Sequence, residues 1–333
     1  MSNDWVLKTF MVALVFSSLL SRAAIARGEG SGLVVGVEKH RVAVAFKYGN
    51  NEDLCIEFER CGVNSLMAIS RMSLHKNPDP QPSTDSVLSE GKQIMKSCTD
   101  WVGPYIMKSL SFPDNGKPQF TGGWHGSNGD GTGNATARTT SYQTHTYGTT
   151  KIKKGTPVRC EKIVLTVTNK IQAYNLKKDV VKEVVEYTIL PGQMRVNTLI
   201  LALDNLVIIR YYGLQTQNSA WNGVISYITP TGEAAEPSVV SAKLNSASGG
   251  KKDFPEIRKY VLTSSDGKNE LTAWLDREYG LGKMDNVLDT LPCAFTQKYG
   301  KSYFNLINGE EVKLRKGKKL YWRGGYVFRS GEK

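Results

Sequence analysis

After its first 20 residues the chain has no long apolar run, and nowhere does it carry the complete catalytic signature of a common enzyme class. The longest later apolar stretch, around Thr198 to Ile209, is interrupted by Asp204 and Asn205. A membrane helix needs about 18 consecutive apolar residues. We therefore expect a soluble mature protein with no membrane partner once its N-terminal segment has been removed.

The N-terminal segment itself predicts export. Lys8 precedes an apolar run from Thr9 to Leu20, which is too short to span a bilayer comfortably, and Ala24-Ile25-Ala26 offers small residues for signal peptidase. We place the cleavage after Ala26. The protein is then secreted and extracellular, or periplasmic if its source is Gram-negative. An N-terminal core helix is the alternative.

Cysteine is scarce and odd in number: the five are Cys55, Cys61, Cys98, Cys160 and Cys293. They lack the paired short spacings of a zinc site, and nothing around them is typical of a cysteine nucleophile. In an exported chain this number predicts one or two disulfides and at least one free thiol. The spacing leaves the pairing open.

Acidic residues are outnumbered, and the formal net charge is +12. Loss of the signal peptide lowers it by only one, because Lys8 and Arg22 leave together with Asp4. Outside a cell this excess favours polyanionic partners such as uronate polysaccharides, anionic wall polymers or nucleic acid. A merely solvated basic surface is the alternative.

Helical periodicity is nearly absent, with weak helix candidates only at residues 89–99 and 285–291. Short runs of alternating apolar and polar residues, separated by Gly, Asn and Pro turns, recur instead. These runs are residues 33–37, 42–46, 163–168, 184–189, 196–202, 206–212, 224–228, 303–307 and 320–328. We predict a mainly β chain whose antiparallel sheets pack as a β-sandwich or jelly roll.

The same patterns divide the chain into four parts. Residues 1–26 are the predicted signal peptide, and residues 27–75 form a β segment that we assign to the main domain. Residues 76–89 are rich in Pro and Ser and predict an exposed loop. Residues 90–333 form the main β-sandwich domain.

The segment Gly122 to Thr139 holds six glycines and no aliphatic residue larger than alanine, together with Trp124, His125 and Asn128. It cannot form a core strand along its whole length, and glycine lets a backbone approach a ligand closely. We predict a binding or catalytic loop; a plain surface connection is the alternative.

Two further features of this loop suggest other kinds of site. Asn128, Asp130, Thr132 and Asn134 alternate with glycines, as calcium ligands do, but an EF-hand-like loop would want more carboxylates and a glutamate where Thr139 stands. We therefore predict no cofactor, with calcium as the weaker alternative. Asn134-Ala135-Thr136 also fits a glycosylation acceptor, which matters only in a eukaryote.

A dense polar set follows the loop: Arg138, Tyr142, Gln143, His145 and Tyr147. If residues 142–147 form a strand, alternation puts Gln143, His145 and Tyr147 on one face. β-Elimination at a uronate needs a partner for the carboxylate, a base for the C5 proton and an acid for the leaving oxygen, and these groups suit that chemistry. Ordinary polar residues on an exposed strand face are the alternative.

A second polar and aromatic set extends from Arg210 to Trp221. It follows an apolar strand predicted at residues 206–209, and we expect that strand to end in a site. Structural tyrosines at a sheet edge are the alternative. We expect substrate contacts from Arg195 and Asn197, which share a strand face, and from Arg210, Gln215, Trp221 and Trp322. Trp322 belongs to the basic and aromatic run from Lys313 to Arg329, which suits a polyanion groove, although a solvated last hairpin is as good an explanation.

Gln143-Thr144-His145 and Tyr211-Tyr212-Gly213-Leu214-Gln215 resemble the Gln-x-His and tyrosine-strand motifs of secreted jelly-roll polysaccharide lyases such as alginate and glucuronan lyases. The resemblance covers only these short segments. It implies cleavage of an acidic polysaccharide, with His125 or His145 as neutraliser or base and Tyr211 or Tyr212 as proton donor. Arg138 and Arg210 would bind carboxylates.

The alternative function is a non-catalytic β-sandwich that binds carbohydrate or a cell surface, in which Trp124, Tyr212, Trp221 and Trp322 stack on sugars. A glycoside hydrolase ranks lower, because Glu183, Glu186 and Asp204 form no recognisable carboxylate pair. A nuclease ranks lowest, because the chain shows no metal-binding carboxylate cluster.

Overall fold

The computed structural model describes residues 32–95, 98–114, 116–149, 153–228, 238–239, 257–297 and 299–331. The predicted signal peptide lies outside these residues. The described residues belong to one compact unit. In the described part of the chain, no helix is both long and apolar enough to cross a membrane.

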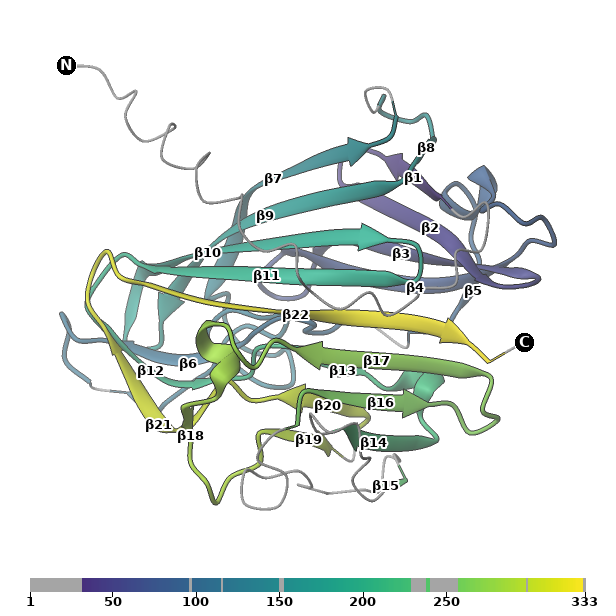
Figure 1. Ribbon diagram of the computed structural model, residues 1–333. Helices are drawn as coiled ribbons and strands as arrows, with labels where there is room; N and C mark the ends of the chain where they lie inside the picture. Colours follow the sequence, from purple (N-terminus) through teal and green to yellow (C-terminus); the bar gives the residue numbers. More distant parts are fainter. Residues whose placement is uncertain are drawn as a thin grey trace. The chain divides into compact units, whose positions relative to one another are not determined.

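Two large sheets account for most of this unit (Figure 1). One is six-stranded, in the order β5 (Lys92–Gln93), β4 (Leu66–Lys76), β3 (Glu52–Cys61), β2 (Arg41–Gly49), β1 (Leu33–Val37) and β8 (Val158–Cys160). The other is nine-stranded, in the order β15 (Ser238–Val239), β14 (Val224–Ile228), β16 (Lys259–Thr263), β17 (Asn269–Leu275), β22 (Lys319–Ser330), β11 (Gln193–Ala202), β10 (Leu176–Leu190), β9 (Lys162–Ala173) and β7 (Ala137–Tyr147).

Two smaller sheets complete the fold. A four-stranded sheet has the order β18 (Asn286–Val287), β21 (Ile307–Leu314), β12 (Leu206–Tyr211) and β6 (Tyr105–Ser109), and a three-stranded sheet has the order β13 (Gln215–Gln217), β20 (Lys301–Phe304) and β19 (Ala294–Gln297). Short 3-10 helices are η2 (Thr84–Val87), η3 (Ser219–Trp221) and η4 (Gly280–Lys283). Strand pairs in the described residues are antiparallel, except for the parallel pair β18 and β21.

The long strands form because their sequences alternate, which buries one face and leaves the other partly exposed. In β9 every second residue is buried over the whole strand. The large sheets share one core: the rings of Phe58 in β3 and Tyr187 in β10 are 5.1 Å apart, and those of Phe46 in β2 and Phe328 in β22 are 6.1 Å apart. The prediction of a mainly β fold with antiparallel sheets in a sandwich is confirmed.

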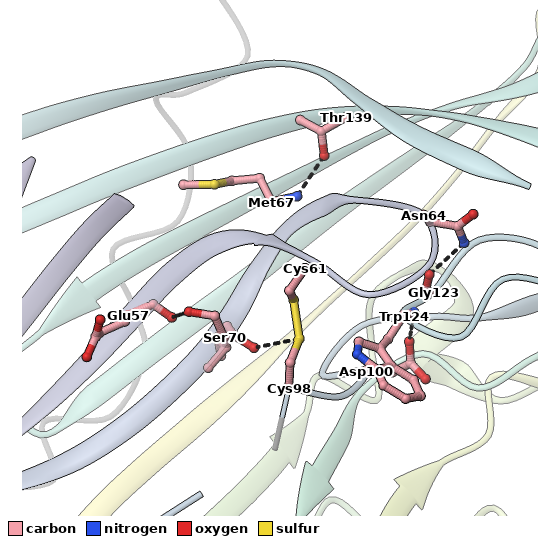
Figure 2. The surroundings of a disulfide bond; sticks show 11 residues. Glu57, Cys61, Asn64, Met67, Ser70, Cys98, Asp100, Gly123, Trp124 and Thr139 are labelled. Atoms are coloured by element: carbon pink, nitrogen blue, oxygen red, sulfur yellow. Dashed lines mark hydrogen bonds between the residues drawn. A yellow bond between two sulfur atoms is a disulfide. The ribbon is translucent and has the colours of Figure 1, made fainter. Parts of the chain in front are cut away.

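The helix candidates at residues 89–99 and 285–291 are wrong. The first range contains the short strand β5, and the second contains β18, in which a two-residue pairing replaces a helical turn. Cys61 and Cys98 form a disulfide (Figure 2), and Cys55, Cys160 and Cys293 are buried thiols. The expectation of at least one disulfide and at least one thiol is therefore confirmed.

Candidate functional site

Part of the glycine-rich loop, the turn after β12 and the three-stranded sheet meet around a cavity of about 410 Å³, which we call the inner pocket. Its lining is rich in aromatic rings and also holds an acid, a lysine and a histidine. The lining residues are Thr99, Asp100, Pro104, Phe120, Trp124, His125, Gly129, Tyr212, Gln215, Tyr299, Lys301 and Tyr303.

A more open groove of about 820 Å³ lies elsewhere, beside β4 and β5. No aromatic residue belongs to its described lining, and its charged groups are limited there to Lys92 and Asp266. Concave sites that combine apolar walls with a few convergent polar groups are typical of small-molecule binding. The inner pocket fits that description better, so we take it as the candidate site.

Glycine conformations shape the loop that carries Trp124 and His125. Gly122 and Gly123 both have φ of +69°, and Gly126 has φ of +70°. A Cβ on Gly123 would come within 2.6 Å of Oδ1 of Asp100 and 2.8 Å of Cβ of Pro104. Only glycine therefore lets this backbone pass so close to the acid in the pocket wall.

Asp100 is a buried acid at the centre of the polar groups. Its Oδ2 lies 3.5 Å from Nε2 of His125 and 3.5 Å from Nζ of Lys301. Its other oxygen, Oδ1, accepts a hydrogen bond from the backbone N–H of Trp124 (Figure 2). Burial lowers the pKa of Lys301, and the neighbouring Asp100 carboxylate opposes that shift.

His125 is buried, with both ring nitrogens near oxygen atoms. Nε2 faces Asp100, and Nδ1 lies 3.3 Å from the carbonyl oxygen of Gly126. A carboxylate and a carbonyl only accept hydrogen bonds, so the imidazole is the donor wherever one of these contacts is a hydrogen bond. The ring of Phe120 packs edge-on against the imidazole, with centroids 4.7 Å apart. Both nitrogens thus face protein oxygens, so these contacts hold the imidazole in place beside Asp100.

Tyrosines form the opposite part of the lining. Nη1 of Arg210 donates to Oη of Tyr212 over 3.2 Å, a contact that would also stabilise negative charge on that oxygen. Oη of Tyr299 and Oη of Tyr303 are 2.6 Å apart. Burial raises the pKa of both Tyr299 and Tyr303, so these two phenols stay protonated and neutral near neutral pH.

Gln215 lies behind this wall and is fully buried. Its backbone N–H donates to the carbonyl of Trp101, and its carbonyl accepts from Oη of Tyr326. The side-chain Nε2 and Oε1 have no hydrogen-bond partner among the described residues. A buried amide without partners is costly, and such groups in native proteins call for a ligand or a water.

The inner pocket thus unites four residues predicted from sequence: Trp124, His125, Tyr212 and Gln215. Arg210 joins them through its hydrogen bond to Tyr212, and it also donates to Oδ1 of Asn308 over 2.7 Å. Tyr212 lies in the turn between β12, which ends at Tyr211, and β13, which begins at Gln215, whereas Trp124 and His125 come from the glycine-rich loop.

Three predicted site residues lie in the core instead. Tyr211, Trp221 and Trp322 are fully buried. Tyr211 stacks on Tyr105 with centroids 4.2 Å apart and accepts a hydrogen bond from Nε1 of Trp322. The proposed roles of Tyr211 in proton transfer and of the two tryptophans in stacking on sugars do not fit these positions, because no solvent reaches their rings.

The polar set on β7 lies along the edge strand of the nine-stranded sheet. Gln143, His145 and Tyr147 are exposed on one face, as the predicted alternation requires. Arg138 is engaged by Asp179 through two hydrogen bonds of 2.7 and 2.8 Å, and Oη of Tyr142 donates to the carbonyl of Lys39. None of this set is among the described residues that line the inner pocket.

Two further predicted residues, Arg195 and Asn197, are exposed on one face of β11. Asn197 donates to Oε1 of Glu186 on the neighbouring strand over 3.1 Å. Neither residue belongs to the described lining of the inner pocket. Asn128 lies in the glycine-rich loop, where its Nδ2 donates to Oγ1 of Thr132.

Three of the side chains considered as calcium ligands, those of Asn128, Asp130 and Thr132, form hydrogen bonds with one another. Oδ1 of Asp130 accepts from both the backbone N–H and the hydroxyl of Thr132, and these hydrogen bonds lower the pKa of Asp130. Across the described residues, no group of three or more His, Cys, Asp or Glu side chains is placed to hold a metal ion.

Sequence reasoning missed Asp100, Phe120, Tyr299, Lys301 and Tyr303. A signal for Lys301 and Tyr303 was present, because they stand two residues apart, the period that places residues on one face of a strand, here β20; Tyr299 lies in the turn before it. Asp100 and Phe120 lie on irregular segments, whose positions depend on contacts with distant parts of the chain.

Comparisons with known proteins give structural likeness only. No family model matches the chain, and no curated protein matches its sequence. An alpha-galactosidase from Lactobacillus brevis is similar with a TM-score of 0.45 and 11% identity, over 89% of this chain and 40% of the other. The GH36 alpha-galactosidase AgaB from Geobacillus stearothermophilus gives 0.43 and 10%, over 86% and 39%.

A galactose 1-epimerase from Lactobacillus acidophilus NCFM is similar with a TM-score of 0.38 and 9% identity, over 90% of this chain and 98% of the other. The chain spans about 40% of the length of the alpha-galactosidases. Likeness at this level says nothing about activity. The inner pocket is the structural basis for a proposal about function.

Proposed function

We propose that the inner pocket binds a uronate residue of an acidic polysaccharide and breaks the neighbouring glycosidic bond by β-elimination. The observation that carries the proposal is the convergence of Lys301, His125 and Tyr212 on one pocket with aromatic walls. Aromatic rings stack on sugar rings, and the cationic and donor groups suit a carboxylate. The net charge of +12 and the predicted export of the chain favour an acidic polymer outside the cell.

The chemistry needs a neutralised carboxylate and a group that moves a proton. In this proposal Lys301, paired with Asp100, donates to the uronate carboxylate, which makes the C5 proton more acidic, and His125 contacts the same Asp100 carboxylate. Tyr212 is the proton carrier, because Arg210 donates to its oxygen and favours negative charge there. Asp100 is a positioning residue, since it acts through the two groups that it orients.

In the proposed step, Tyr212 enters as phenolate and takes the C5 proton. The electron pair of the C5–H bond forms the C4=C5 double bond, and the C4–O bond breaks with its pair leaving on the glycosidic oxygen. The phenol then gives its proton to that oxygen. No co-reactant is consumed, and the products are a free hydroxyl end and an unsaturated uronate.

A second function, binding without cleavage, is favoured by one observation. Five of the residues lining the inner pocket are aromatic: Phe120, Trp124, Tyr212, Tyr299 and Tyr303. Such a lining is sufficient to hold a sugar by stacking, with no chemical step.

Ultraviolet absorbance separates the two functions, because elimination creates an absorbing unsaturated uronate and binding does not. The full chain is incubated with alginate, glucuronan, hyaluronan and pectate. We expect a rise on at least one polymer, and Tyr212→Phe should lower the rate by about 100-fold or more while binding is retained. The control is Tyr321→Phe, which removes the hydroxyl of a tyrosine outside the pocket that is 43% exposed. Binding with no absorbance rise on any polymer would leave the non-catalytic function.

A further inference from the structure

A second cavity of about 520 Å³ adjoins the inner pocket, and we call it the outer cavity. Its lining consists of Ile106, Lys117, Pro118, Gln119, Phe120, Ser127, Asn128, Gly129, Gly133 and Asn134. Phe120 and Gly129 belong to both linings. The two cavities are therefore neighbours that share a wall made of one aromatic ring and one glycine.

The shared wall lies beside the groups to which the proposed function gives chemistry. The ring of Phe120 is 4.7 Å from the imidazole of His125 and 6.0 Å from the ring of Tyr212, measured between centroids. A ligand that extends from one cavity into the other must pass Phe120. The bond that joins its two halves would then lie next to His125 and Tyr212.

The outer cavity has the polar groups that an acidic sugar requires. Its described lining contains no acidic residue. It contains one ammonium group, that of the exposed Lys117, and the side-chain amides of Gln119, Asn128 and Asn134. Oδ1 of Asn128 remains available to accept from a sugar hydroxyl, because only its Nδ2 is used by Thr132. Amides match hydroxyl groups, and an ammonium matches a carboxylate.

We infer that the outer cavity is a second sugar subsite in which Lys117 contacts the carboxylate of the next uronate, so that the chain crosses Phe120 with its scissile bond beside His125 and Tyr212. This inference rests on the proposed function for its substrate class. It adds that the natural ligand has at least two sugar residues, with one in each cavity.

The test measures affinity rather than turnover, so that it stands apart from the absorbance assay. Alginate-derived oligouronates of one, two and three residues are titrated calorimetrically into the full chain carrying Tyr212→Phe. We expect a clear gain in affinity from one residue to two. Adding Lys117→Ala should weaken binding of the two-residue ligand by about threefold, as for an exposed ion pair, and leave the one-residue ligand unchanged.

A matched charge control uses Lys313→Ala, which removes an exposed lysine of β21 that lines neither cavity. It should leave both affinities unchanged. Charge reversal by Lys117→Glu should weaken the two-residue ligand further than Lys117→Ala. An affinity that does not grow with the second residue, or an equal effect of Lys117→Ala and Lys313→Ala, would overturn the second subsite. Neither result depends on whether the wild-type chain cleaves the polymer.

Discussion

Nζ of Lys301 and Oδ2 of Asp100 lie 3.5 Å apart, and both side chains are largely buried. Asp100→Asn keeps the side-chain oxygen that accepts from Trp124 but removes the charge that faces Lys301. Loss of one partner from a buried ion pair leaves the other charge uncompensated, so the free energy of unfolding should fall by about 3 kcal/mol. Urea unfolding measures this change, and the same variant should lose most elimination activity because Lys301 and His125 lose their common anchor.

The double variant Asp100→Asn with Lys301→Met tests the assignment. Methionine removes the stranded ammonium, so the double variant should be more stable than Asp100→Asn alone. If the two substitutions instead destabilised additively, the pair would not be coupled, and the stability of this wall would have another source.

The disulfide Cys61–Cys98 ties the segment before Asp100 to the turn after β3. The same turn reaches the glycine-rich loop. Val63 donates from its backbone N–H to the carbonyl of Trp124. Nδ2 of Asn64 donates to the carbonyl of Gly123 (Figure 2). The two cysteines are 37 positions apart, and a loop of this length corresponds to about 4 kcal/mol of chain entropy.

We therefore expect Cys61→Ala with Cys98→Ala to lower the unfolding free energy by up to about 4 kcal/mol and to weaken sugar binding, because Asp100 and Trp124 both lose support. Thermal unfolding and titration with oligouronates measure the two effects. The control is Cys160→Ala, which changes a buried cysteine that belongs to no disulfide and should leave binding intact. Unchanged binding in the double variant would show that the pocket holds its shape without the bridge.

We predict that the side chain of Gln215 lowers the stability of the ligand-free protein but contributes to sugar binding. Gln215→Leu replaces a buried amide without hydrogen-bond partners among the described residues by an apolar side chain of similar size. The ligand-free protein should become more stable by about 1 kcal/mol, and affinity for oligouronates should fall if the amide meets the sugar. Gln143→Leu, on the exposed face of β7, is the matched control. A loss of stability in Gln215→Leu would mean that the amide is already satisfied in the wild-type protein.

The fold was largely predictable because its long strands carry their own pattern. Alternation in residues 163–168 and 184–189 reflects burial of one face of β9 and β10, which is a local property of the sequence. Two-residue strands such as β5 and β18 carry no such pattern, so the sequence of their regions predicts helices instead.

The candidate site was predictable only in part, for a similar reason. Trp124 and His125 were found because an excess of glycine marks their loop, whereas Asp100 and Lys301 meet through the pairing of distant strands, which no local pattern records. Tyr211 and Arg138 are predicted as site residues only because of the chemistry of their side chains. Burial of Tyr211 and the pairing of Arg138 with Asp179 are properties of the folded chain alone.

Glu183 is a buried acid on the inner face of β10 and does not belong to the described lining of the inner pocket. Its Oε1 accepts from Oη of Tyr105 over 2.6 Å, and its Oε2 accepts from Nδ2 of Asn169 over 2.9 Å. Burial raises the pKa of Glu183 above its ordinary value of 4.5, although these two hydrogen bonds oppose the shift. The folded protein therefore binds this proton more tightly than the unfolded chain does.

The sign of the pH dependence follows from that difference. Between pH 4.5 and the raised pKa of Glu183, the folded state holds more protons than the unfolded state, so stability falls as pH rises through this window. Glu183→Gln cannot ionise, and the stability of the wild-type protein relative to this variant should decline as the pH rises above 4.5. Urea unfolding at several pH values measures the decline. Glu186→Gln, on the opposite face of the same strand, should show no such trend, and a constant difference between wild type and Glu183→Gln across this range would contradict the raised pKa.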